Sequence, residues 1–309
     1  MLLLHAGFPK TGTTSLQDIF SREASASPRL LYLGPTVAAD NPRLQTKRSR
    51  RWVNFVRGVK MRQNTDRLAQ DFGELCDAHA NSRSAIDIIV SDEMLSSSLS
   101  ENWETSALWQ NVERVVNATH IDRKEVVVLL GVRDADAMLP SNYAQFRRKV
   151  RNLFPDVNDF LRFLLDGGWP GYVERFDAEA LRNSANALGL HLRLLPMAEI
   201  KAAQWVGPQG LLDDVFPWSR RHPLPALNVR QAQAGTWQSD GITLFDRVEV
   251  AARRLPIRMP PEYLYRGLKA TLGRVRIESA QKITPDPALL EEVRQRFGSV
   301  EAAAQERPE

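Results

Sequence analysis

The feature that most constrains the fold stands at the start of the chain, where a short apolar run leads into a glycine- and threonine-rich loop. Leu2 to Phe8 reads as a β-strand, and an amphipathic stretch beginning at Thr13 reads as a helix. Between them, Gly7 to Gly12 fits the G-x-x-x-x-G frame of loops that bind phosphate through backbone amides and a helix N-terminus. The spacing therefore predicts a strand–loop–helix unit that binds an anion.

The side chains of this loop favour a phosphate-like group over magnesium triphosphate. A nucleotide triphosphatase places a lysine directly after the second glycine, but here Thr13 takes that position and the lysine stands earlier, as Lys10. Neutral hydroxyl donors surround the second glycine, at Thr11, Thr13, Thr14 and Ser15. The alternative is a plain strand-to-helix turn in which Thr13 or Ser15 serves only as a helix cap.

Three further apolar runs predict strands, and long helical stretches separate them. The runs cover residues 85–90, 125–132 and 191–196. Strands that alternate with helices are typical of a three-layer α/β/α fold with a mostly parallel central sheet. We therefore expect an α/β protein that opens with a P-loop-like strand–loop–helix.

The rest of the chain predicts one domain with insertions. Apolar residues at helical spacing predict a helix over 43–67, and further helices are expected up to Val150 and over 286–297. A segment near 205–240 is rich in Pro, Gly, Trp and Gln and reads as loops. We expect a single domain over residues 1–309, with a basic helical insertion near 43–80.

The formal charge of +4 is unevenly distributed. Residues 1–70 hold twelve lysines and arginines against four acids, an excess of eight, so the remainder carries a net charge of −4. This excess indicates an anionic ligand near the start of the chain. No apolar run is long enough to cross a membrane, and the opening residues lack the features of a signal peptide, so we expect a cytoplasmic protein.

Cysteine and histidine usage bounds the chemistry further. The single cysteine, Cys76, excludes an internal disulfide framework. The five histidines are scattered and none has the spacing of a metal-binding pair, so no metal site is expected.

Two motifs together resemble those of the sulfotransferase family that uses 3′-phosphoadenosine 5′-phosphosulfate (PAPS). The first runs Pro9-Lys10-Thr11-Gly12-Thr13-Thr14-Ser15-Leu16 and is similar to the family's 5′-phosphosulfate loop. The second, an arginine after a strand and a serine eight residues later, is similar to the family's 3′-phosphate site and consists of Arg133 and Ser141. The resemblance implies PAPS as donor, no metal, and transfer of a sulfuryl group to a hydroxyl or amine.

The ends of the predicted strands supply candidates for the chemistry. Residues 8–14, 91–93 and 133–141 all follow strands, and the carboxyl ends of parallel strands share the edge where ligands bind. Sulfuryl transfer needs a base for the acceptor's proton, for which Glu93 is the candidate, and positive charge on the leaving phosphate oxygen, for which Lys10 is the candidate.

The identity of the base stays open at this stage. The family uses histidine in some branches and glutamate in others, so Asp92, His120 and His222 remain alternatives to Glu93. The same Ser91-Asp92-Glu93 segment also fits a helix N-terminus capped by Ser91. The late Arg-Lys-Gly loop that closes over the cofactor in many members is missing here, and Arg230 is the nearest candidate for its role.

The acceptor is predicted only by class. The stretch 43–67 carries nine basic residues and one acid, and the chain holds seven tryptophans, which together favour an acidic glycan or glycoconjugate. A solvated helix face and ordinary packing explain the same patterns. The oligomeric state is left undetermined.

Two other functions fit the sequence less well than sulfuryl transfer. A P-loop kinase or nucleotide triphosphatase acting on a small molecule is disfavoured by Thr13 and by the lack of a clear strand-terminal aspartate after Val132. A nucleic-acid-binding module would use the basic helix but leaves the hydroxyl-rich loop unexplained, so no nucleic acid partner is expected.

Overall fold

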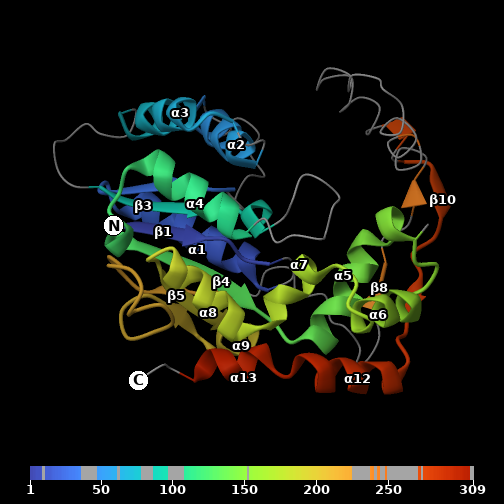
Figure 1. Ribbon diagram of the computed structural model, residues 1–309. Helices are drawn as coiled ribbons and strands as arrows, with labels where there is room; N and C mark the ends of the chain where they lie inside the picture. The colour runs from blue at the N-terminus through green and yellow to red at the C-terminus, as the bar shows by residue number, and fades with distance from the viewer. Residues whose placement is uncertain are drawn as a thin grey trace. The chain divides into compact units, whose positions relative to one another are not determined.

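The core of the protein is a sheet of five parallel strands in the order β2-β3-β1-β4-β5 (Figure 1). The computed structural model describes residues 1–8, 11–35, 47–60, 63–77, 86–96, 108–151, 153–224, 237–239, 242–243, 248, 271–272 and 274–306. The strands cover Leu2–His5 (β1), Leu30–Leu33 (β2), Asp87–Ser91 (β3), Val126–Val132 (β4) and His191–Pro196 (β5). The predicted α/β class with a parallel sheet is confirmed.

The described residues form two compact units, and the first contains this sheet. It comprises Met1–Asp134, Gly168–Val229 and Phe297–Glu309. Its α-helices are α1 (Thr13–Ala26), α2 (Lys47–Lys60), α3 (Thr65–Asp77), α4 (Leu108–Thr119), α7 (Pro170–Val173), α8 (Ala178–Ala187), α9 (Met197–Ala202) and α13 (Val300–Gln305). Its shorter elements are the 3-10 helices η2 (Glu93–Ser96), η3 (Arg123–Glu125) and η4 (Glu174–Phe176), and the antiparallel pair β6 (Trp205–Val206) and β7 (His222–Pro223).

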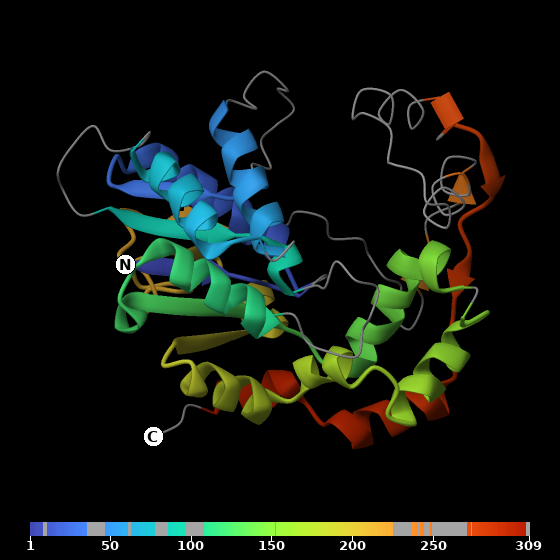
Figure 2. The same ribbon diagram turned by 45° about the horizontal axis from the view of Figure 1, so that its top comes forward.

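Helices cover both faces of the sheet because its two main crossovers run along the sheet in opposite directions. The connection through α1 leads from β1 to β2 on one side, whereas the connection through α4 leads from β3 across β1 to β4. Right-handed crossovers in opposite directions place their helices on opposite faces. In Figure 2, α4 lies on one side of the sheet, with α2 and α3 packed next to it.

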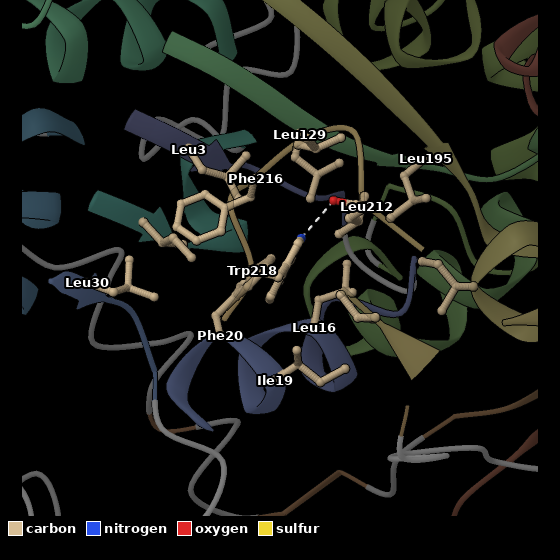
Figure 3. Close-up of a cluster of buried hydrophobic side chains, with 14 residues drawn as sticks. Leu3, Leu16, Ile19, Phe20, Leu30, Leu129, Leu195, Leu212, Phe216 and Trp218 are labelled. Atoms are coloured by element: carbon tan, nitrogen blue, oxygen red, sulfur yellow. Dashed lines mark hydrogen bonds between the residues drawn. The ribbon is translucent and has the colours of Figure 1, made fainter. Parts of the chain in front are cut away.

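A hydrophobic cluster fills the space between the sheet and α1 (Figure 3). Leu3 and Leu129 point from neighbouring strands toward Phe20 of α1, all of them buried. Trp218 stacks on Phe20 with 6.0 Å between ring centroids, and its indole Nε1 donates to the Leu212 carbonyl at 2.7 Å. The segment 204–224 is therefore packed as part of the core, although its sequence reads as loops.

The single helix predicted over 43–67 is wrong, because the structure has two helices, α2 and α3, in and beyond this range. The break comes at Asn64, whose side-chain Oδ1 accepts from the Asp66 amide at 2.7 Å, while its carbonyl accepts from the Leu68 amide. This is how an asparagine starts a new helix. The predicted apolar face is confirmed, since Phe55, Val56 and Val59 are buried.

Strand β2 and helix α4 are absent from the sequence predictions. Leu30–Leu33 is only four residues long, and periodicity cannot assign so short an apolar run. It becomes a strand because β3 provides a parallel partner, with Leu31 opposite Ile88.

The second unit comprises Ala135–Gly167 and Arg230–Arg296. Its described elements are α5 (Ala135–Val150), α6 (Val157–Leu165), most of α12 (Pro287–Phe297), and the antiparallel pairs of β8 (Trp237–Gln238) with β11 (Lys282–Ile283) and of β9 (Ile242–Thr243) with β10 (Arg276–Glu278). Its core includes Tyr143, which lies 5.7 Å from the Phe160 ring and donates its hydroxyl to the Phe154 carbonyl. The helices predicted near 144–150 and over 286–297 are confirmed. Among the described residues, no helix is long and apolar enough to cross a membrane.

Candidate anion-binding site

The loop after β1 begins at the carboxyl edge of the sheet, between the ends of β3 and β4. The Ala6 amide donates to the Leu129 carbonyl of β4 at 3.1 Å, and the Asp92 amide donates to the His5 carbonyl at 3.0 Å. The end of β1 is thus paired on both sides. The position at which the loop starts is therefore held by hydrogen bonds to both neighbouring strands.

Thr11 holds the loop against strand β4. Its side chain is fully buried, and its hydroxyl donates to the Phe8 carbonyl at 2.6 Å. It lies over Gly131, where an added Cβ would come within 2.7 Å of the Thr11 hydroxyl oxygen and 3.2 Å of its carbonyl oxygen. A glycine in a strand interior often marks such a close backbone approach. The Thr11 hydroxyl therefore shapes the loop, and its proton is already donated.

Helix α1 presents an N-terminus that carries no side-chain cap. Gly12 occupies the N-cap position with φ 77°, a left-handed conformation that glycine adopts without strain, and no acid lies in the first turn. Gly12 and Thr14 are partly exposed, whereas Thr13 and Ser15 are buried. The aligned peptide dipoles concentrate about half a positive charge at the N-terminus of a helix. This arrangement is suited to binding an anion.

The position after Gly12 serves packing. A Cβ on Gly7 would collide with the Thr13 methyl group, so the two residues fit only because Gly7 has no side chain. Thr13 is 2% exposed. The site where a nucleotide triphosphatase has its lysine is thus occupied by a short, buried threonine.

His5 lies beneath the loop as a neutral imidazole. Its Nδ1 is 2.7 Å from the Ser91 hydroxyl oxygen and its ring packs edge-on against Phe20. Its Nε2 has no hydrogen-bond partner among the described residues and faces Gly7, 3.3 Å from where a Cβ would stand. Complete burial lowers the pKa of His5 from 6.5 to about 3. The sequence places His5 in the first strand and predicts a core or near-core residue, which its burial at the end of β1 confirms.

We expect His5 to make stability depend on pH. Its folded pKa is below its unfolded pKa, so its contribution is complete above about pH 6.5 and is lost as pH falls toward 3, because the unfolded chain binds a proton that the folded chain does not. Replacing His5 by Asn removes the titrating group. Urea unfolding should show that the stability difference between wild type and His5→Asn shifts by about 2 kcal/mol between pH 7.5 and pH 5.0, in favour of the variant.

The matched control for this pH effect is Ser91→Ala, which removes the hydroxyl beside Nδ1 but keeps the imidazole. It should retain the wild-type pH dependence. An equal stability difference for His5→Asn at both pH values would show that His5 does not titrate on unfolding.

The candidate base Glu93 begins the short helix η2 beside the loop. The Ser96 hydroxyl of η2 donates to the Gly7 carbonyl at 3.2 Å, which ties this helix to the loop. A short helix does begin at Glu93, as the alternative to the catalytic role expected, and the Ser91 hydroxyl before it contacts His5. The side chain of Glu93 lies outside the described residues, whereas Asp92 is half-buried at the end of β3.

Arg133 follows β4 directly, two residues after the Gly131 that contacts the loop. Its neighbour Asp134 is fully engaged elsewhere: its carboxylate accepts from the Ser299 hydroxyl and from the Glu301 amide, each at 3.0 Å, and so anchors the start of α13. Ser141 lies in α5 of the second unit, whereas Arg133 belongs to the first. Pro9, Lys10 and Arg230 lie outside the described residues.

The two other candidate histidines stand away from the loop. His222 is buried against Glu23 of α1, with 2.5 Å between Nε2 and the carboxylate. Although burial alone raises the pKa of Glu23, hydrogen bonds from His222 and Ser219 outweigh it and lower that pKa. Glu23 lies ten residues beyond Thr13, roughly 15 Å along the helix. His120 lies in the turn after α4 that precedes β4, at the opposite edge of the sheet from the loop.

A buried arginine that the sequence analysis did not single out borders the loop. The Arg175 guanidinium lies over the Phe8 ring, 4.6 Å from its centroid, and over the Tyr172 ring at 4.0 Å. No local sequence signal marks it, because the contact joins η4 to a loop residue far away in the sequence.

Comparison with models of known protein families, with curated protein sequences and with solved structures gives no match.

Proposed function

We propose that this protein is a PAPS-dependent sulfotransferase that transfers a sulfuryl group to a hydroxyl or amine acceptor. The observation that carries the proposal is the uncapped N-terminus of α1, led by Gly12 in a left-handed conformation at the carboxyl edge of the central strand. Such an end binds a phosphate or phosphosulfate through backbone amides. The motif that resembles the family's phosphosulfate loop coincides with this end.

In this proposal the loop residues hold the donor's 5′ end and Arg133 holds its 3′-phosphate together with Ser141. The donor supplies an activated sulfuryl group. Glu93 takes the acceptor's proton, since η2 stands beside the loop. Lys10 balances the charge on the phosphate oxygen that leaves. Closure of the site by Arg230 and a carbohydrate acceptor remain proposals from the sequence.

Phosphoryl transfer from Mg-ATP is the alternative. It draws support from Asp92, a carboxylate after β3, next to the loop-bearing strand β1. Against it stand the buried Thr13, which leaves no amine after Gly12, and Asp134, whose carboxylate anchors α13. Sulfuryl transfer needs neither feature, so it is the preferred reading.

Thermal shift measurement separates the two functions. Adenosine 3′,5′-bisphosphate, the desulfated donor, should raise the melting temperature by about 5 °C at a hundredfold excess over its Kd, without added metal. Mg-ATP at the same concentration should give a much smaller shift. Stabilisation by Mg-ATP but not by the bisphosphate would overturn the proposal.

A substitution of Arg133 tests where the 3′-phosphate binds. Arg133→Ala should weaken binding of the bisphosphate at least tenfold, because a bidentate charged contact to phosphate is lost. Arg123→Ala is the matched control, since Arg123 lies before β4, at the other edge of the sheet, where it bonds the Leu188 carbonyl. Unchanged affinity in Arg133→Ala would show that the 3′-phosphate is bound elsewhere.

A further inference from the structure

Arg175 is a buried cation that contacts two aromatic rings. The residue is 8% exposed, and the two residues over whose rings it lies, Phe8 and Tyr172, are each 3% exposed. The electron-rich faces of these rings attract the guanidinium. They accept no conventional hydrogen bond from its N–H groups, which need acceptors elsewhere.

One of these N–H groups has an acceptor within the described structure. Nε donates to the Tyr172 carbonyl at 2.7 Å. For the two terminal nitrogens no acceptor is found among the described residues, and no carboxylate there lies within the 4.0 Å of an ion pair with Arg175. The four N–H donors on the two terminal nitrogens of the guanidinium thus have no acceptor among the described residues.

A buried charge that forms no ion pair costs free energy, although the Glu174 carboxylate offsets part of the effect of burial on the pKa of Arg175. Desolvation lowers the pKa of Arg175, and an isolated buried ion is costly unless it is paired and hydrogen-bonded. Cation–π contacts contribute only about 0.5–2 kcal/mol each. The contacts around Arg175 therefore do not fully offset the free-energy cost of burying its charge, and an anionic ligand would lower that cost.

The location of Arg175 identifies which ligand it would meet. Phe8, whose ring it covers, lies in this loop directly after Gly7, and the Phe8 carbonyl accepts the hydrogen bond from the Thr11 hydroxyl that shapes the loop. Arg175 therefore borders the same carboxyl edge as the N-terminus of α1. The two features offer complementary parts of one site: backbone amides from the helix and a planar fork of charged donors.

We propose that Arg175 binds an oxyanion at the loop that connects β1 to α1, through the N–H groups that its aromatic neighbours leave unpaired. The proposal rests on the proposed function, which makes this oxyanion either the phosphosulfate of the donor or an acidic group of the acceptor. Both sources present oxygen atoms to the same guanidinium.

The experiment compares wild type with Arg175→Met, in which an unbranched apolar side chain keeps the contact with both rings but carries no charge. The probe is inorganic sulfate, with binding measured by calorimetry and stability by thermal unfolding. Arg182→Met is the matched control, because Arg182 is a half-buried arginine that bonds backbone carbonyls of Ala303 and Glu306.

We expect Arg175→Met to lose at least tenfold in sulfate affinity while its melting temperature without ligand is unchanged or higher. The Met variant loses the Nε hydrogen bond and the two cation–π contacts, but it also loses the free-energy cost of burying a charge without an ion pair, and we expect the second effect to be at least as large. A lower melting temperature would instead indicate a cation that only supports the rings. Unchanged sulfate affinity would overturn the proposal. If Arg175→Met fails to fold, the uncharged variant Arg175→Gln takes its place, and the same affinity criterion decides.

Three ligands then locate the oxyanion. A loss of affinity for PAPS but not for the bisphosphate assigns Arg175 to the sulfuryl group, and a loss for both assigns it to the 5′-phosphate. A loss for sulfate only in protein saturated with the bisphosphate assigns it to the acceptor side.

The same measurements keep this proposal apart from the proposed function. Wild type that binds sulfate through Arg175 but not the bisphosphate would retain the oxyanion site and reject the sulfotransferase. Wild type that binds the bisphosphate, with sulfate affinity unchanged in Arg175→Met, would do the reverse.

Discussion

Replacing Lys10 by alanine is expected to reduce sulfuryl transfer by about 10²–10³-fold, because the charge that develops on the leaving phosphate oxygen would lose its only compensating cation within the loop sequence. Binding of the bisphosphate should fall by less than tenfold, since the backbone amides of α1 remain. The measurement is release of adenosine 3′,5′-bisphosphate from PAPS with a panel of glycan acceptors.

The matched control is Lys124→Ala. Lys124 is exposed in η3, before β4 and therefore at the amino edge of the sheet. Its loss should leave transfer unchanged. Equal rates for wild type and Lys10→Ala would remove Lys10 from the chemistry and leave the loop as a binding element only.

Replacing Gly131 by valine should abolish anion binding at the loop, because Thr11 occupies the space that any side chain at this position needs. Even a Cβ alone would come within 2.7 Å of the Thr11 hydroxyl and 3.0 Å of its Cβ. The hydroxyl cannot turn away without breaking its bond to the Phe8 carbonyl. Overpacking of this kind costs about 1–3 kcal/mol and displaces the loop.

Calorimetry with sulfate and urea unfolding together measure both effects of the Gly131 substitution. Gly131→Ala is the milder variant and should weaken sulfate binding about tenfold, so the prediction holds even if the valine variant does not fold. The control is Gly73→Ala in α3, where an added Cβ meets nothing within 4 Å and should stabilise the helix by about 0.5–1 kcal/mol. Wild-type sulfate affinity in Gly131→Ala would mean that Thr11 does not set the loop's shape.

Much of the fold follows from local sequence patterns. The β-branched run before Arg133 forms β4, buried on both faces, and the spacing from Gly7 to Gly12 marks the turn from β1 into α1. These elements are predictable because their signals lie within one strand or one turn of helix. The start of α3 at Asn64 also has a local signal, because an asparagine before Thr65 and Asp66 favours a helix N-terminus. The sequence prediction missed this signal because the apolar periodicity continues on both sides of Asn64.

The remaining elements of the site depend on contacts between distant segments. Gly131 within an apolar run is a sign of close approach, but no pattern says that Thr11 is what approaches it. Arg175 has no local signal at all, and its place over Phe8 follows from the packing of η4 against the end of β1. His222 shows the reverse: a histidine in a loop-like sequence is buried against Glu23.

By itself, the sequence determined the class of the fold, the position of the strand–loop–helix for which we propose anion binding, and the residues that resemble a PAPS site, because each depends on neighbours in the chain. Only the tertiary structure decided which polar groups already have hydrogen-bond or ion-pair partners within the protein and which do not. Thr11 and Asp134 are held by internal hydrogen bonds, whereas Arg175 is buried without an ion pair among the described residues. Burial and pairing are properties of the assembled core, where desolvation makes an unpaired charge costly.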